Sequence, residues 1–530
     1  MKLFNKNSRI LIGMLVVGLV VLTTSCEDYL KDELLSDTSA DFTYNTPEGL
    51  EAATVGLYSL NRALYEDGEW NSARAMTMIA KSDLVFGRSG EISLYATLSW
   101  GRTVNDFGSK RFSRFWRHHY RLVDRANAVI QGAENTEMDE TRKNVLIAEA
   151  KAMRANSYFT LYRMFNNIFI TTEPTTPENG FDRPEAPSTE EEIFTLINSD
   201  LDFAIANLDW TTDQYGRWTQ AAARHLRAKT AIWQKDYTEA ALQADAVIDN
   251  GSYNLVGNTK DVFKGDYNNG ETLFAIQYAD PNETIGGGNM HRMNFNVVAQ
   301  YNRIDGADFA IENGARGAGF LMPNEYLRNL LKEDPNDDRD DHTYYISYYT
   351  YNDVANLPAG KKVGDTIDVY EEYGSQHRNY YLTMNPGVLK YLQDDAVPDE
   401  ASQVKNILIY RLAETYLIGA EAHMMNGNTA KALTYINAVR TRANATELTE
   451  IDLQAILDER ARELAFEGQR WYTLKRTGKL IEFMRDHAGN EQWKFIARER
   501  IEDWMVNMPI PQSELDLLGP NYPQNSGYTD

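Results

Sequence analysis

The sequence contains a single cysteine, Cys26, in 530 residues. One cysteine excludes any intramolecular disulfide and any zinc site built from several thiolates. Basic residues are also scarce, since 53 Lys and Arg stand against 77 Asp and Glu and give a formal net charge of −24. Such a chain lacks the basic face that phosphate backbones require, so we expect no nucleic-acid partner. The same charge disfavours electrostatic binding to anionic lipid.

The N-terminal apolar run is too short to cross a bilayer, which takes ~20 apolar residues. Residues 10–22 are all apolar or Gly, and they follow a basic start that contains Lys2, Lys6 and Arg9. This order of a basic segment and a short apolar segment is typical of a secretory signal peptide. The sequence therefore predicts a signal peptide over residues 1–25.

Cys26 directly follows the small residues 23–25. This arrangement resembles the lipobox of bacterial lipoproteins, in which the cysteine thiol is acylated and becomes the mature N-terminus. The lipobox usually has Leu three positions before the cysteine, whereas Leu22 lies four before it. The alternative is an ordinary secretory signal with an incidental cysteine. We expect residues 26–40 to form a lipidated, acidic tether, which is similar to the export signal of surface lipoproteins in Bacteroidetes-type bacteria.

Apolar and small residues recur at helical spacing in several stretches of the chain. In two of them a small residue, Ala240 or Ala432, lies four positions after a turn-forming residue, Asp236 or Asn428. This spacing resembles the second helix of a tetratricopeptide repeat, where small residues let two helices approach closely. We expect a mostly α fold with about four degenerate helix pairs, near residues 112–166, 189–250, 406–443 and 451–485.

The stretch between the second and third pairs, about residues 260–405, has a different composition. Fourteen of the 31 tyrosines lie between positions 260 and 400. In "TYYISYYTY" a strand would place tyrosines on both faces, with Tyr345, Tyr349 and Tyr351 on one and Tyr344 and Tyr348 on the other. These rings either pack a loop or form a platform for sugar rings, because Tyr offers a flat apolar face with a polar tip.

The C-terminal third carries a set of motifs in a specific order. Residues 406–444, "NILIYRLAETYLIGAEAHMMNGNTAKALTYINAVRTRAN", resemble the most recognisable segment of SusD-like proteins. Residues 456–480 and the closing "MPIPQSELDLLGPNYPQNSGY" at 508–528 are similar to the next signatures of that family. With the lipoprotein start and the Asp-Pro…Asp-Arg element at 334–339, the resemblance to the RagB/SusD family spans most of the chain.

The resemblance implies a single SusD-like domain over residues 41–530. Its helical repeats would cover about 112–250 and 406–485, its loop-rich and short-strand-rich ligand side about 260–405, and its tail 486–530. Family members are lipid-anchored outer-membrane proteins that face the cell exterior, bind glycans and serve a SusC-like TonB-dependent transporter. The implied protein is not an enzyme and needs no cofactor or metal. Two alternatives are a binding lipoprotein for another cargo, such as peptide, and a surface glycoside hydrolase.

Signals for catalysis are weak. Glu459, Glu463 and Glu467 recur every four residues and would share a helix face. Paired carboxylates serve glycosidases, but a run of this kind beside several arginines favours an ion-pair lattice. No Gly-x-Ser-x-Gly occurs, and the acidic "DPNDDRDD" has Arg339 where a calcium loop needs Gly, which favours a solvated turn.

Ligand residues of the family lie in variable loops, so candidates rest on chemistry alone. They are aromatic residues in loop-like surroundings with polar neighbours, together with a basic residue that could bond hydroxyls or an acidic sugar. The alternative for each aromatic residue is a place in the core. The candidates are Trp70, Trp100, Tyr301, Arg303 and Tyr345.

Overall fold

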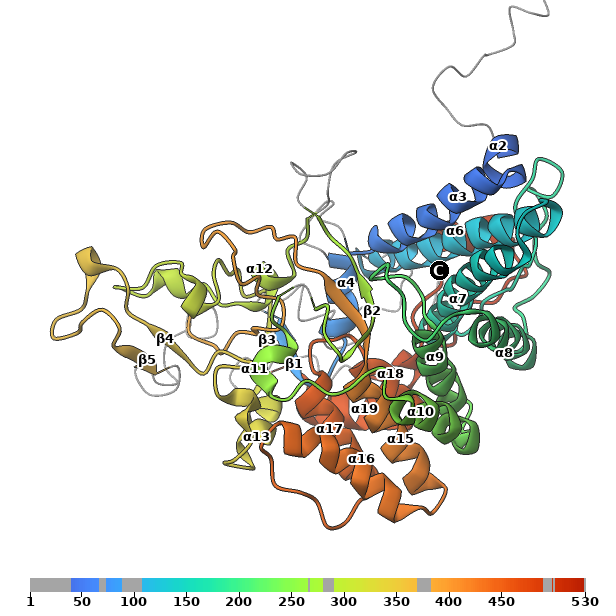
Figure 1. Cartoon of the computed structure of the whole chain (residues 1–530). Coiled ribbons are helices and arrows are strands. Elements are labelled where there is room, and N and C mark those ends of the chain that lie inside the picture. The colour runs from blue at the N-terminus through green and yellow to red at the C-terminus, as the bar shows by residue number, and fades with distance from the viewer. Residues whose placement is uncertain are drawn as a thin grey trace, which may run out of the picture.

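The protein was analysed as a computed structural model, which describes residues 40–65, 73–87, 107–265, 267–279, 290–368, 383–489, 498 and 501–528. Figure 1 shows a large helical part on the right and below, and a loop-rich lobe on the left. Helices predominate, which confirms the mostly α prediction. In the part of the chain that the structure describes, no helix is both long and apolar enough to span a bilayer.

The helical part is built from two groups of helices that meet in the middle. The first group is α2 (Ala40–Asn45), α3 (Pro47–Arg62), α4 (Ala73–Ala80), α6 (Phe107–Asn135), α7 (Glu140–Phe165), α8 (Glu190–Asn207), α9 (Gln220–Trp233) and α10 (Tyr237–Asn250). The second group is α15 (Leu412–Met425), α16 (Thr429–Arg442), α17 (Leu453–Leu464), α18 (Arg470–Arg476), α19 (Leu480–His487) and α20 (Gln512–Leu518). Helix α15 packs between α10 and α16, so the two groups form one continuous layer.

Short polar residues begin these helices, as capping chemistry requires. The turn-forming Asp236 and Asn428 are the N-caps of α10 and α16, and their side chains accept hydrogen bonds from the backbone three residues on. Thr189 and Glu192 form a capping box at α8. The small residues Ala240 and Ala432 are fully buried. The predicted close approach of helices at these positions is therefore present.

The boundaries of the predicted helix pairs differ from the structure. Residues 189–250 hold three helices, and residues 451–485 hold α17, α18 and most of α19. Helix α17 ends at Leu464 and Phe466 has a positive φ of 68°, so Glu467 lies beyond the helix. The prediction that Glu467 shares a helix face with Glu459 and Glu463 is wrong for that reason. The tetratricopeptide character of the pairs stays a prediction.

The described strands are few and short, and all of them pair antiparallel. Two pairs join segments far apart in the sequence, and one pair joins neighbouring segments. The pairs are β1 (Val85–Gly87) with β3 (Leu321–Pro323), β2 (Thr272–Ile276) with β6 (Ile407–Arg411), and β4 (Tyr348–Thr350) with β5 (Thr366–Asp368). Strands β2 and β6 enter and leave the loop-rich lobe and lie side by side at its base (Figure 1). This pairing closes the lobe where it joins the helices.

The lobe between β2 and β6 has its own small core. Its other elements are α11 (Thr259–Val262), just before β2, and α12 (Met293–Val297), η2 (Tyr301–Arg303), η3 (Ile311–Asn313), α13 (Glu325–Lys332), η4 (Asp338–Asp340) and η5 (Val354–Asn356). A buried cluster around Tyr301, Ile346, Tyr349 and Ile367 holds the outer part together. The lobe is thus a packed unit, although most of its backbone is irregular.

The C-terminal tail returns to the end of α7. The Asn525 side-chain amide donates to the carbonyl oxygens of Phe165 and Met508, and the Met508 N–H donates to the Met164 carbonyl. Gln524 pairs with the backbone of Ile510 in both directions. The closing motif of the sequence therefore fastens the last residues to the first helical group.

Candidate functional site

A buried ion-pair lattice joins the loop-rich lobe to α17. Glu459 and Glu463 are fully buried, and one Arg339 nitrogen donates to both, at 2.7 and 3.1 Å. Glu463 also accepts from Arg411 at 2.6 Å and from Arg442. Burial alone would raise the pKa of Glu463, but these arginines outweigh it and hold the pKa well below its usual range. Glu463 is therefore ionised and serves structure.

Glu467 extends the same lattice beyond the end of the helix. It accepts from the Lys390 ammonium at 2.7 Å and from two Arg411 nitrogens at 2.8 Å. Lys390 also donates to the carbonyl oxygens of Glu463 and Ala465, which are left open where the helix ends. Burial lowers the pKa of Lys390 to about 8. The lattice interpretation of the glutamate motif is confirmed, and its partners come from the lobe as well as from the helices.

The acidic "DPNDDRDD" segment is part of this lattice. Arg339 is fully buried and pairs with Asp337 at 2.6 Å in addition to the two glutamates. Asp334 accepts from the backbone N–H groups of Thr446 and Asn336. The expectation of a solvated turn is therefore wrong, because the segment locks the lobe onto the loop after α16. Among the described residues, no group of three or more His, Cys, Asp or Glu is arranged to hold a metal ion.

Two of the tyrosines proposed to bind ligand lie in the core of the lobe. Tyr301 is fully buried, its ring stacks on Tyr349 with centroids 4.9 Å apart, and its hydroxyl donates to the Ala315 carbonyl at 2.9 Å. Tyr345 is 1% exposed and packs near Phe466. Protein covers both rings, so neither presents a face to an outside ligand in this structure. The two belong to different buried clusters and do not form a common platform.

Arg303 and Tyr348 lie on the surface of the lobe. Arg303 ends η2 and is exposed, two residues from the buried Tyr301. Tyr348 is 38% exposed, and its ring stacks on His342 with centroids 4.6 Å apart and planes 23° from parallel. Tyr348 belongs to the tyrosine-rich strand of the sequence analysis but was not singled out there as a ligand residue. The strand alternation places it opposite Tyr349, but the sequence does not say which face is covered.

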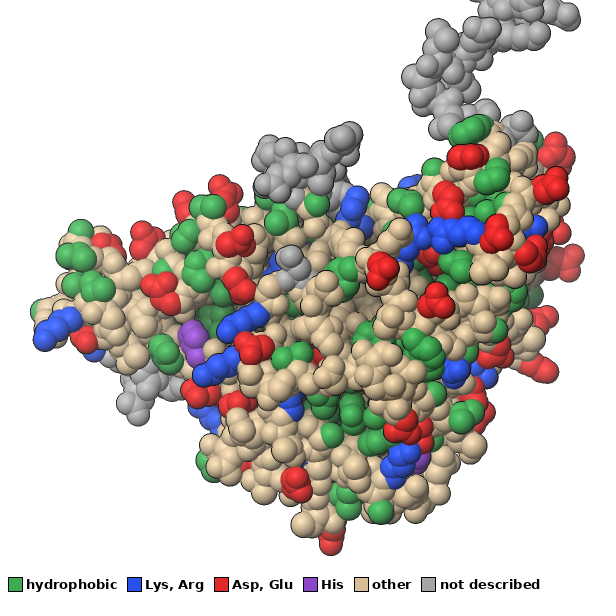
Figure 2. Space-filling view, viewed as in Figure 1, with side chains coloured by type: hydrophobic (Ala, Val, Ile, Leu, Met, Phe, Trp, Pro, Cys, Tyr) green, Lys and Arg blue, Asp and Glu red, His purple; other side chains and the backbone are tan. Residues whose placement is uncertain are grey.

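The remaining candidates, Cys26, Trp70 and Trp100, lie outside the described residues. Their roles stay predictions. The lobe has an irregular backbone and packs on the helices. It exposes the stacked pair of Tyr348 and His342 and the side chain of Arg303. Figure 2 shows acidic side chains spread over one face of the molecule, with basic side chains and a histidine near the junction of the lobe with the helices.

Two family models together match most of the chain. The model described as the SusD family matches residues 266–528, and one described as starch-binding associating with outer membrane matches residues 28–231. The chain belongs to the SusD-like family. A SusD-like protein of Bacteroides ovatus is 26% identical over 93% of this chain and 86% of its own length.

Solved structures of SusD-like proteins share the fold. A laminarin binding SusD-like protein has a TM-score of 0.71 and 25% identity, and the match covers 92% of this chain and all of that one. Surface glycan-binding protein A of Bacteroides thetaiotaomicron, in complex with laminarihexaose, has a TM-score of 0.68 and 22% identity over 91% of this chain and all of that one. The predicted SusD-like, mostly α fold is confirmed.

Proposed function

We propose that this SusD-like protein captures a glycan on the outer surface of the cell and delivers it to a SusC-like TonB-dependent transporter. The observation that carries the proposal is the full-length likeness to a laminarin binding SusD-like protein. The family model for starch-binding proteins associated with the outer membrane supports the location. A lipid on Cys26 would hold the protein there, and binding would not be followed by hydrolysis.

The ligand surface would combine the loop-rich lobe with the segments that carry Trp70 and Trp100. Arg303 and the stacked pair of Tyr348 and His342 supply exposed polar and aromatic groups on the lobe. Tyr301 and Tyr345 would act as supports that fix the lobe, because their rings are covered. A shallow surface orders flexible sugar and excludes little water, so a single site should bind with a Kd on the order of micromolar to millimolar.

The test is a binding screen of the mature protein against a glycan panel that includes laminarin. Trp100→Ala and Arg303→Ala should each remove most of the binding to whichever glycan the wild type binds, with little change in melting temperature. Phe181→Ala is the matched control, because Phe181 is 91% exposed but lies in the connection between α7 and α8. Tyr301→Ala should instead lower the melting temperature.

Three results would contradict this proposal. If both ligand variants keep the wild-type affinity, the proposed surface is not the binding site. If no glycan binds while a peptide library does, the cargo is different. New reducing ends after incubation with a bound glycan would favour a surface glycoside hydrolase. Co-purification with a large β-barrel transporter would test the proposed partner.

A further inference from the structure

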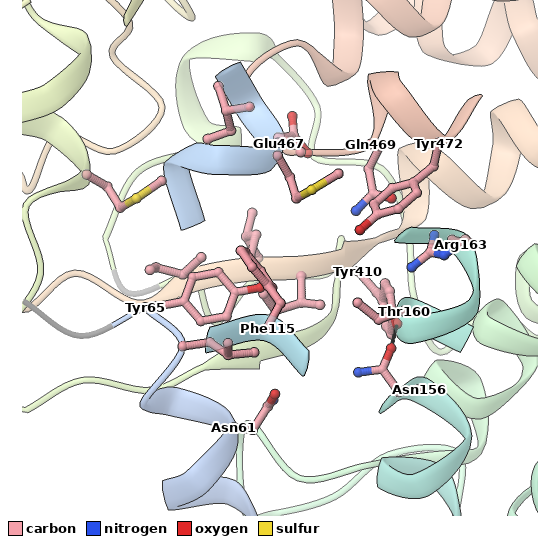
Figure 3. Close-up of a pocket in the computed structure, with 18 of the residues that line it drawn as sticks. Asn61, Tyr65, Phe115, Asn156, Thr160, Arg163, Tyr410, Glu467, Gln469 and Tyr472 are labelled. Atoms are coloured by element: carbon pink, nitrogen blue, oxygen red, sulfur yellow. Dashed lines mark hydrogen bonds between the residues drawn. The ribbon is translucent and has the colours of Figure 1, made fainter. Parts of the chain in front are cut away.

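A cavity of about 110 Å³ lies where the helical part meets the lobe. Figure 3 shows it between α7, β6 and the turn that leads into α18. Part of its lining is apolar or aromatic and includes Leu64, Phe115, Ile407 and Tyr410. A cavity needs roughly 10–15 Å³ to hold the centre of one water molecule, so this one can admit a group of several atoms.

Helix α7 lines the cavity with hydrogen-bond donors. Asn156, Thr160 and Arg163 are spaced by four and three residues, so they lie on one face of the helix and are seen together in Figure 3. The side-chain carbonyl oxygen of Asn156 accepts a hydrogen bond from the Tyr410 hydroxyl at 2.7 Å. The two N–H groups of the same amide are not used in this bond. Within the described part of the chain, neither these amide groups nor the Thr160 hydroxyl has a hydrogen-bond partner.

Arg163 is the unusual member of this set. Its guanidinium lies between the rings of Phe159 and Tyr472, 4.0 and 3.9 Å from their centroids, and Nε donates to the Phe159 carbonyl. The rings cover both faces of the cation, and only its edge stays uncovered. The two terminal nitrogens on this edge have no hydrogen-bond partner among the described residues. No described carboxylate lies within ion-pair distance, and burial lowers the pKa of Arg163. A buried cation without a counter-charge is costly.

The neighbouring charges do not compensate for Arg163. A smaller cavity of about 20 Å³ adjoins the first and shares Arg163 and Lys229 with it. Glu414 forms ion pairs with both Lys229, at 2.8 Å, and Arg460, at 3.1 Å. The remaining cation that lines the smaller cavity, Arg476, is paired with Glu421. These four cations therefore share two carboxylates. Glu467 also lines the larger cavity, but it is already paired with Lys390 at 2.7 Å and Arg411 at 2.8 Å.

We propose that this cavity is a binding site for a small oxyanion of the phosphate or sulfate type. The edge of Arg163 would bind two of its oxygens, as a guanidinium fork does with such anions. The Thr160 hydroxyl and the Asn156 amide would donate to the others. Water could satisfy the same donors but would not neutralise the excess positive charge. The bound anion would link α7 to β6 and to the turn after α17. This proposal does not depend on the proposed glycan binding.

The test is calorimetric titration of the mature protein with inorganic phosphate at constant ionic strength. We expect a saturable isotherm with about one site, and a phosphate-dependent rise in melting temperature, because a ligand that binds only the folded state stabilises it by mass action. Arg163→Met should lower the affinity at least ~tenfold, which corresponds to ~1.4 kcal/mol. Thr160→Val should have a smaller effect in the same direction.

Arg154→Met is the matched control. Arg154 is a buried arginine on the same helix, but its nitrogens are taken by Asp200, at 2.8 Å, and by Asn127, at 2.7 Å. This variant should lose stability and keep the phosphate response. Equal phosphate responses in wild type and Arg163→Met, or no response in the wild type, would overturn the proposal. Crystals of the wild type soaked in selenate give a check that needs no variant, since an empty cavity in the anomalous map would also overturn it.

Discussion

At the scale of single residues, Glu463 lies at the centre of the buried ion-pair lattice. It is fully buried and accepts hydrogen bonds from Arg339, Arg411, Arg442 and the Tyr344 hydroxyl. Without Glu463, the buried arginines would keep their other carboxylates but would have one buried counter-charge fewer. The stability of the junction between lobe and helices therefore depends on this carboxylate.

Glu463→Gln should lower the free energy of unfolding by about 3–5 kcal/mol, because the neutral amide keeps the shape and removes the charge that the arginines need. Urea unfolding at pH 7 measures the loss. Glu482→Gln is the control, since Glu482 forms an exposed pair with Lys479 and should change stability by less than ~1 kcal/mol. Similar losses in the two variants would contradict a central role for the lattice.

Asp340 should make the free energy of unfolding depend on pH, with a sign that follows from its raised pKa. Burial raises its pKa to about 6, against the opposing effect of Lys332 and Arg328. The unfolded chain has an Asp pKa of ~3.9, so its contribution to stability is present below that value and is lost as the pH rises through about 6. Asp340→Asn cannot ionise. Its stability relative to wild type should therefore increase between pH 4 and 7 in urea unfolding.

Asp353 provides the opposite case on the same lobe. Hydrogen bonds from the Asn356 side chain and from the Ala355 N–H lower its pKa. Its contribution to stability is therefore present at neutral pH and lost as the pH falls, so Asp353→Asn should gain nothing between pH 4 and 7. A difference between Asp340→Asn and wild type that does not change with pH would show that Asp340 titrates normally.

At the scale of elements, small side chains decide how closely α10, α15 and their neighbours approach. Ala240 on α10 is fully buried in a cluster with Ile418 and Ala422 of α15. Gly419, on the same helix, lies so close to the Tyr435 ring that an added Cβ would be 2.8 Å from it. Larger side chains at these positions would separate the helices.

Ala240→Leu should lower the free energy of unfolding by about 1–3 kcal/mol, because a close-packed interface has no room for the added methylenes. Chemical denaturation followed by circular dichroism measures it. Leu242→Ala is the control on the same helix, since Leu242 is 59% exposed and its truncation should change stability by less than ~0.5 kcal/mol. A neutral Ala240→Leu would mean that the helices separate at no cost.

At the scale of the whole molecule, a stable helical part carries an irregular lobe. The strand pair β2–β6 and the buried lattice fix the lobe at its base. Binding proteins commonly carry their ligand residues on loops that a rigid scaffold positions. Under the proposed function the tether would add a third part. It would confine the protein to the membrane beside the proposed transporter and would raise the effective concentration of a weakly bound ligand there.

Cys26→Ala should release the protein from the membrane fraction, because the anchor would be acyl chains that contribute ~0.8 kcal/mol per buried CH₂. Fractionation of cells that express the variant and the wild type measures this. Intact mass of the wild type should show a lipidated N-terminus at Cys26. A variant that stays in the membrane fraction, together with a wild type that carries no lipid, would contradict the anchor.

The sequence by itself determined the helical character, the turns at Asp236 and Asn428, the small residues at the helix contacts and the lattice role of Glu459 and Glu463. These features depend on local spacing and on residue chemistry, which a single chain displays directly. The family followed from an ordered set of motifs, which the two matching family models confirm.

Only the tertiary structure decided which tyrosines are exposed. Alternation separates Tyr348 from Tyr349, but burial depends on what packs against each face. Tyr349 is covered by Tyr301, which lies outside the strand pair. The same holds for Arg339, whose carboxylate partners Glu459 and Glu463 lie 120 and 124 positions away. The donor-rich cavity on α7 also depends on long-range packing, because Tyr472 and Tyr410 reach Arg163 and Asn156 from the far end of the chain.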